Sequence, residues 1–101
     1  MEKMDFKAGM YVIVRTYSAG VFAGKLVARN GREVKLKGAR RLWYWSGAAS
    51  ISELAMKGVK RPADCKFPEP VTEILLLEAI EIVPVTAAAQ RSIEKVRPWA
   101  A

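Results

Sequence analysis

An asparagine–glycine pair at positions 30–31 constrains the fold of this chain more than any other feature. Both central residues of a type I′ turn need positive φ, and Asn-Gly tolerates that conformation best. Strands are predicted on either side of the pair, over residues 21–29 and 32–37, because apolar and charged residues alternate there. The pair therefore predicts a tight hairpin with one buried face and one basic face.

The hairpin is expected to belong to a larger antiparallel unit over residues 10–45. Residues 10–17 are rich in β-branched and aromatic residues, which predicts a strand, and a Ser-Ala-Gly turn follows it. Gly24 marks a bulge or a close approach of two backbones. Gly38 interrupts the pattern, so residues 40–45 are predicted as a separate fourth strand.

The second half of the chain predicts helices and further strand. Ser50 and Glu53 match a capping box, which begins a short helix over residues 50–58. Residues 71–84 fit an amphipathic helix, one bent strand or two short strands, and their β-branched residues favour strand. Thr86 is expected to cap a C-terminal helix over residues 86–97, which a proline ends.

These elements predict the α+β class, with a small, strongly twisted, mostly antiparallel sheet, SH3-like hairpins and two short helices. A length of 101 residues indicates one domain spanning residues 1–101. A homo-oligomer is expected, because a body this small gains burial by assembling. Trp99 is expected to dock the C-terminal tail onto the body or onto a neighbouring subunit.

The composition argues against an enzyme. The chain has no histidine, and its single cysteine, Cys65, can form neither an intramolecular disulfide nor a cysteine metal site. Glu78 and Glu81 form the only close carboxylate pair outside the ends, and in a strand they point to opposite faces. No catalytic residue, metal or cofactor is therefore predicted.

The positive charge is concentrated in the first half of the chain. Residues 1–45 hold ten Lys/Arg and three Asp/Glu, whereas residues 46–101 hold seven of each. This asymmetry predicts an anionic partner such as a nucleotide, nucleic acid or an acidic surface. The alternative is a basic face that serves only solubility.

Neither a signal peptide nor a membrane segment is predicted. The first nine residues form a charged, polar lead-in without an apolar core. The longest nearly apolar run, residues 74–85, is short and contains Glu78 and Glu81. The expected location is the cytoplasm of a host cell, with no membrane partner.

The run of residues 40–45 is the best candidate for a binding site. Guanidinium groups grip phosphates and indole rings stack on bases, and a regular strand would place Arg41 beside Trp43 on one face. The turn at Tyr17 and Ser18 could cradle a phosphate, and the helix beginning after Ser50 could face the same pocket. The predicted ligand-binding residues are Arg40, Arg41, Trp43, Tyr44, Trp45, Ser46, Tyr17, Ser18 and Ser50.

A structural explanation exists for each part of this site. The tryptophans could lie in the core or at a subunit interface while the arginines are merely solvated. The turn at residues 17–20 could be an ordinary hairpin turn, and the helix after Ser50 a plain connector. These alternatives remain open on sequence alone.

Several runs, at residues 14–21, 39–45, 47–48, 54–55 and 78–82, carry a resemblance to known proteins. The most specific is Arg-Arg-Leu-Trp-Tyr-Trp. The segment that contains them resembles a family of small uncharacterised bacteriophage and prophage proteins. The resemblance implies a phage origin and no particular chemistry. By analogy of size and class, such proteins include oligomeric sponges that sequester the cyclic nucleotide signals of host defence without cleaving them.

Three functions follow as alternatives. The favoured one is a non-catalytic phage protein that sequesters a cyclic oligonucleotide or related nucleotide immune signal, of the anti-CBASS or anti-Thoeris type, in an arginine and aromatic pocket. The second is a nucleic-acid-binding module that uses the basic face of the hairpin. The third is a structural or interaction protein without a small ligand.

Overall fold

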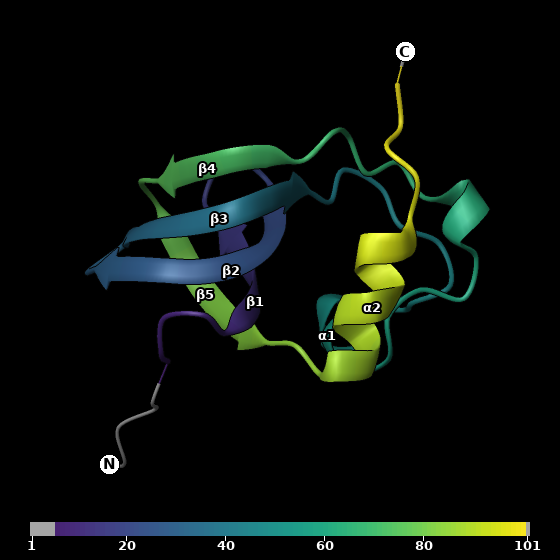
Figure 1. Cartoon of the computed structure of the whole chain (residues 1–101), viewed down its shortest axis with the longest axis horizontal. Coiled ribbons are helices and arrows are strands. Elements are labelled where there is room, and N and C mark those ends of the chain that lie inside the picture. Colours follow the sequence, from purple (N-terminus) through teal and green to yellow (C-terminus); the bar gives the residue numbers. More distant parts are fainter. Residues whose placement is uncertain (1–5, 101) are drawn as a thin grey trace.

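The computed structural model describes residues 6–100, so residues 1–5 of the predicted polar lead-in, and residue 101, lie outside it. The predicted α+β class is confirmed: five antiparallel strands form one sheet and two helices pack beside it (Figure 1). In chain order the elements are β1 (Tyr11–Thr16), β2 (Val21–Asn30), β3 (Glu33–Arg41), α1 (Ile51–Lys57), the 3-10 helix η1 (Pro62–Asp64), β4 (Val71–Leu76), β5 (Ala79–Pro84) and α2 (Ala87–Lys95).

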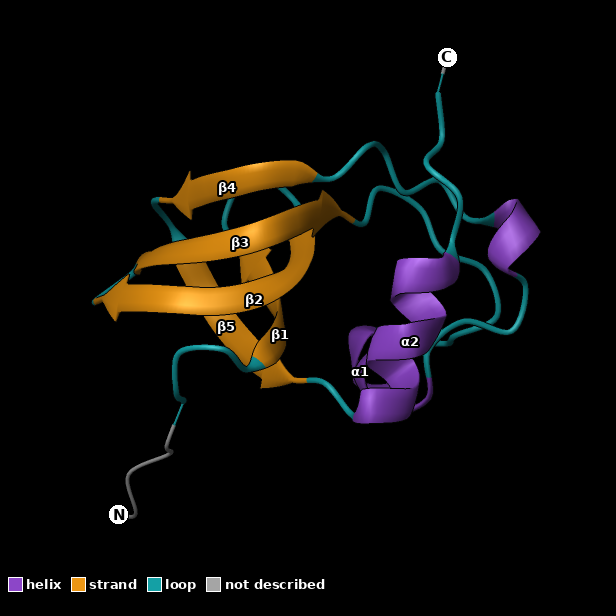
Figure 2. Ribbon diagram, in the orientation of Figure 1, coloured by secondary structure: helices purple, strands orange, loops and turns teal. Residues whose placement is uncertain are grey.

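The sheet is strongly curled. Its strand order is β4-β3-β2-β1-β5, so the two edge strands are consecutive in the chain and only Leu77 and Glu78 separate them. So short a link can join opposite edges only if the sheet bends back on itself, as Figure 2 shows. At this bend the Ala79 amide donates to the carbonyl oxygen of Arg32 at 3.0 Å. The start of β5 is thereby tied to the loop between β2 and β3.

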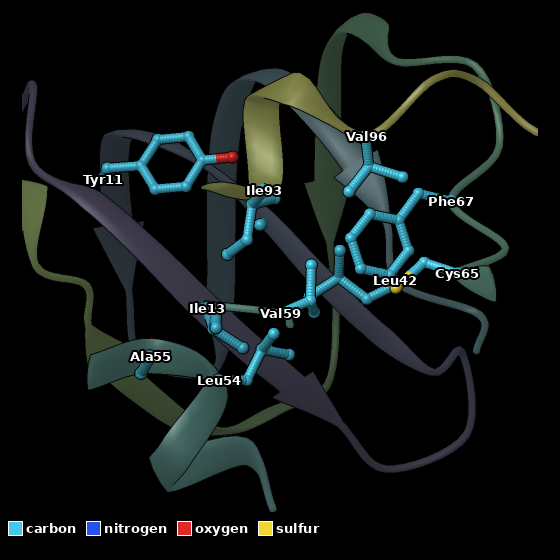
Figure 3. Packing of buried hydrophobic residues seen from close by; sticks show 11 residues of the cluster. Tyr11, Ile13, Leu42, Leu54, Ala55, Val59, Cys65, Phe67, Ile93 and Val96 are labelled. Atoms are coloured by element: carbon cyan, nitrogen blue, oxygen red, sulfur yellow. The ribbon is translucent and has the colours of Figure 1, made fainter. Parts of the chain in front are cut away.

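Two apolar clusters pack on opposite sides of the sheet, and the outer one covers only part of its face. The inner one comes from strands alone and comprises Val12, Val14, Phe22, Leu26, Val34, Leu36, Ala39 and Leu76. The outer one joins β1 to the helices and the connector, as Figure 3 shows, and comprises Tyr11, Ile13, Ala23, Leu42, Leu54, Ala55, Val59, Cys65, Phe67, Ile93 and Val96. Strand β1 lies between the clusters, which explains its nearly continuous apolar sequence.

The prediction that Gly38 ends a strand is wrong, because β3 runs through it from Glu33 to Arg41. Gly38 has a φ of 56° and acts as the extra residue of a β-bulge. Ala23 pairs with Arg40 and Lys25 with Lys37, so two residues of β3 lie opposite Gly24. A Cβ on Gly24 would lie 3.1 Å from the Lys37 carbonyl oxygen, which confirms the predicted close approach of backbones.

The predicted type I′ turn at Asn30-Gly31 is also wrong. Asn30 still belongs to the strand and pairs with Glu33, so the loop is Gly31-Arg32. Gly31 has a φ of 60° and no other residue type has positive φ in the described range, which is the φ pattern of a type II′ turn. A bulge at Val27 puts one extra residue on β2, so that Ala28 pairs with Lys35 and Asn30 with Glu33. Without it, the register of Leu26 and Leu36 would leave a three-residue loop over residues 30–32.

The elements after residue 45 follow the predictions closely. Residues 71–84 form two short strands, as one of the interpretations expected, and no helix. Ser50 accepts the Glu53 amide at 3.3 Å at the start of α1, and Thr86 accepts the Ala89 amide at 3.1 Å at the start of α2. The last helix ends at Lys95, two residues before the predicted end. Within residues 6–100, no helix has both the length and the apolar character to cross a membrane.

Candidate functional site

The chain leaves the sheet at Arg41, so the predicted strand over residues 40–45 does not form. Leu42 is buried. The backbones of Tyr44 and Lys66 pair with each other: the Tyr44 amide donates to the Lys66 carbonyl oxygen at 3.2 Å, and the Lys66 amide donates to the Tyr44 carbonyl oxygen at 2.7 Å. Trp45 is half-buried and packs against the outer cluster. The pairing leaves Trp43 and Tyr44 on the surface, beside Lys66.

Trp43, Tyr44, Lys66 and Trp99 form what we call the aromatic–lysine cluster. The ring centroids of Trp43 and Trp99 are 5.0 Å apart with the planes tilted by 33°. The Lys66 Nζ atom lies 5.5 Å from the Trp43 ring centroid, 5.9 Å from that of Tyr44 and 5.6 Å from that of Trp99. All three rings remain accessible, with exposed fractions of 60 % for Trp43, 51 % for Tyr44 and 38 % for Trp99.

Trp99 is held in place by its backbone, whose amide donates to the Phe67 carbonyl oxygen at 2.9 Å. The tail therefore docks onto the body, which is one of the two places expected for it. Trp99 also forms a wall of an open groove of about 430 Å³, a size in the range of small-ligand sites. The groove is lined by Pro62, Ala63, Cys65, Lys95, Arg97, Pro98 and Trp99.

The groove is positively charged. Lys95 and Arg97 line it, and the Lys66 ammonium lies 5.6 Å from the centroid of the Trp99 ring. Within the part of the chain that the structure describes, none of these three cations forms an ion pair. Their charge is thus available to an anion bound at this surface.

Arg40 has a structural role. It is only 5 % exposed, and it donates to the carbonyl oxygens of Ile93 at 2.9 Å, Phe67 at 3.4 Å and Pro68 at 3.5 Å. Its guanidinium also lies over the Phe67 ring, 5.5 Å from the centroid. Burial lowers the pKa of Arg40 from its ordinary value. The side chain ties the last turn of α2 and the connector to β3, so its donors are engaged within the protein.

Arg41 points to a different place from Trp43. Its Nη1 donates to the Ala19 carbonyl oxygen at 2.6 Å, and its guanidinium lies over the Phe22 ring, 4.4 Å from the centroid. With residues 74–78 it lines a separate cavity of about 240 Å³. The expectation that Arg41 and Trp43 share one strand face is therefore wrong, because the strand ends at Arg41.

The turn after β1 lies beside the cavity that Arg41 lines. The Tyr17 amide donates to the Glu78 carbonyl oxygen at 2.9 Å, and the Ser18 hydroxyl donates to the Glu78 carboxylate at 3.3 Å. The Tyr17 side chain is 76 % exposed. Arg41 and this predicted turn are thus brought together, but away from the aromatic–lysine cluster.

Two predicted site residues mainly serve local structure. The Ser46 amide donates to the Cys65 sulfur at 3.4 Å, and Ser50 caps α1. Sequence reasoning missed Lys66, Lys95 and Arg97 as site residues and placed Trp99 only as a docking residue. The available signal was an Arg-Pro-Trp tail after a helix, but nothing in the sequence links it to residue 43.

These features define a small α+β domain that presents aromatic rings and cations on one surface. A family described as a domain of unknown function (DUF6948) matches residues 9–93, which is most of the chain. The protein belongs to this family, whose description assigns no chemistry. No curated protein and no solved structure matches the chain.

Proposed function

We propose that this protein is a non-catalytic binding protein for a nucleotide ligand, which it holds on the aromatic–lysine cluster. The observation that carries the proposal is the gathering of three accessible rings around one ammonium group. Large aromatic side chains normally bury most of their surface, and an exposed apolar patch of this kind is typical of a binding site.

The chemistry of the cluster suits a nucleotide. A base stacked on an exposed indole face gains about 1–3 kcal/mol. The ammonium of Lys66 and the cations of the adjacent groove, Lys95 and Arg97, can then contact phosphate oxygens. One surface would thus bind both the base and the phosphate of the nucleotide.

In its sharper form, the proposal is that the ligand is a cyclic oligonucleotide immune signal, which a phage protein sequesters from its host. The resemblance of the Arg-Arg-Leu-Trp-Tyr-Trp run to phage and prophage proteins supports this form. A cyclic dinucleotide carries two bases and two phosphates, which suits several rings interspersed with cations. Sequestration also needs no catalytic group.

Single-stranded nucleic acid is the second candidate, and two observations favour it. The cluster is an open surface rather than an enclosed cage. In addition, Lys25 and Lys37 lie directly opposite each other on β2 and β3. Like charges in such a pair destabilise a sheet, and a bound phosphate backbone would offset that repulsion.

Calorimetric titration of the wild-type protein tests the proposal. The probes are a panel of cyclic dinucleotides, mononucleotides and a short oligothymidylate, each measured at low and moderate salt, with the ligand recovered afterwards. We expect saturable binding of a nucleotide that is recovered intact. Tighter binding of the oligonucleotide with a steep loss of affinity in salt would favour nucleic acid. Binding of none of the probes, or recovery of a cleaved product, would refute the proposal.

A further inference from the structure

The two edges of the sheet differ in how they are protected. On β5, the Glu81 carboxylate forms an ion pair with Arg15 at 2.9 Å, and Pro84 ends the strand. Charged residues and prolines on an edge strand hinder pairing with another strand. Strand β4 contains no lysine, arginine or proline. Its only charged residue, Glu73, lies 3.6 Å from the Lys35 ammonium. β4 is therefore the unprotected edge.

The backbone of β4 has hydrogen-bonding capacity to spare. In the described range the strand pairs only with β3, and no other backbone hydrogen bond reaches it. In a strand with one neighbour, about half of the N–H and C=O groups point away from the sheet. An added antiparallel strand would satisfy these groups along the roughly 20 Å that six residues span.

The side chains beside this edge are apolar and exposed. Successive strand residues point to opposite faces, so Val71, Glu73, Leu75 and Leu77 share one face and continue past the end of β4. Leu75 is 55 % exposed and Leu77 61 % exposed. Two neighbouring leucines of this exposure mark an association surface.

We propose that β4 is the self-association edge of this protein, where two copies pair their β4 strands antiparallel about a two-fold axis. A strand that pairs with its own copy forms a self-complementary interface, which is the commonest arrangement in homo-oligomers. The exposed apolar side chains of β4 then lie beside those of the copy on one continuous sheet face. On each copy, Lys35 offsets the charge of Glu73, the only charged residue of the strand. This surface is separate from the aromatic–lysine cluster, so the inference does not depend on the proposed function.

Charge excludes one register of the pair, and apolar contact at the ends favours another. Placing Glu73 opposite itself would set two carboxylates side by side, which destabilises a sheet. A shift that keeps the same faces together places Val71 opposite Leu77 of the second copy, and Glu73 opposite Leu75. This register joins apolar side chains at both ends of the interface.

The mass of the full-length protein in solution, from light scattering after gel filtration, tests the proposal. We expect twice 11.2 kDa for the wild type and 11.2 kDa for the double variant Leu75→Lys/Leu77→Lys. Met56→Lys is the matched control, because Met56 on α1 is 59 % exposed and should leave the dimer intact. Melting curves confirm that each variant is folded. A monomeric wild type, a double variant that remains dimeric or a Met56→Lys protein that dissociates would each overturn the proposal.

Oxidative cross-linking tests the register. Residues directly opposite in an antiparallel pair have Cβ atoms about 4.5–5.5 Å apart, close enough for a disulfide after a small shift. We expect the Val71→Cys protein mixed with a tagged Leu77→Cys protein to form the mixed dimer, while each protein alone forms few cross-links. Cys65 is buried and should not react. Efficient cross-linking of the Val71→Cys protein with itself would contradict this register.

Discussion

Removing the guanidinium of Arg40 should destabilise the protein far more than removing that of Arg41. Arg40 donates to three backbone carbonyls, and the bond to Ile93 is the shortest at 2.9 Å. A buried hydrogen bond from a charged group contributes about 1.5–3 kcal/mol, and the contact with the Phe67 ring about 1–2 kcal/mol. The two longer bonds add less, so Arg40→Ala should cost about 3–5 kcal/mol.

A loss of 3 kcal/mol lowers the melting temperature of a domain this size by at least about 12 °C. Arg41→Ala is the matched control, because Arg41 is exposed and water weakens both its hydrogen bond to Ala19 and its contact with the Phe22 ring. Its cost should stay at about 1–2 kcal/mol. Arg40→Lys should rescue little, since a single ammonium cannot replace a planar fork that reaches separate carbonyls. Differential scanning calorimetry of the three variants is the assay. An Arg40→Ala protein that melts within about 4 °C of the wild type would refute this reasoning.

Three further predictions concern the turns and a buried phenol. Gly31→Val should lower the free energy of unfolding in urea by about 1–2 kcal/mol, because Gly31 has a φ of 60°. Asn30→Ala should lower it much less. Equal losses would show that the turn is of type I′ after all. Gly47→Ala should lower the free energy of unfolding more than Gly31→Val, because the Cβ of an alanine at position 47 would lie 2.6 Å from the Lys60 amide nitrogen. A smaller decrease than for Gly31→Val would show that this loop can shift to make room. Burial raises the pKa of Tyr11 to about 12, so its contribution to stability is complete below pH 10 and is lost as the pH rises from 10 to 12. Tyr11→Phe should flatten that loss in unfolding measured against pH, and an unchanged slope would assign the loss to other groups.

Local signals predicted much of the fold. The caps at Ser50 and Thr86 act over three residues, and both helices begin where the sequence indicates. The strands over residues 10–17 and 21–29 also formed. The errors occurred at bulges, where one inserted residue shifts the register. A glycine such as Gly38 fits both the end of a strand and the extra residue of a bulge, and only the partner strand decides between them.

The candidate site was predicted only in part, because its residues meet across the fold. Alternation placed Arg41 beside Trp43, but the strand ended first and the chain turned to pair with Lys66. Arg40 and Arg41 are neighbours with identical side chains, and the acceptor that distinguishes Arg40 lies 53 residues away at Ile93. Distant acceptors of this kind leave no local pattern in a sequence.

The central claim is that the aromatic–lysine cluster binds a nucleotide, and it is tested most directly by comparing two aromatic truncations. Trp43→Ala removes a stacking surface from the cluster, while Tyr17→Ala removes an exposed ring from the turn whose residues Thr16 and Ala19 line the Arg41 cavity. With the tightest-binding probe of the nucleotide panel, calorimetry should show that Trp43→Ala weakens the dissociation constant at least about tenfold. Tyr17→Ala should change it by less than about twofold. Loss of affinity in the Tyr17→Ala protein, with normal binding by a folded Trp43→Ala protein, would contradict the claim and move the site to the Arg41 cavity.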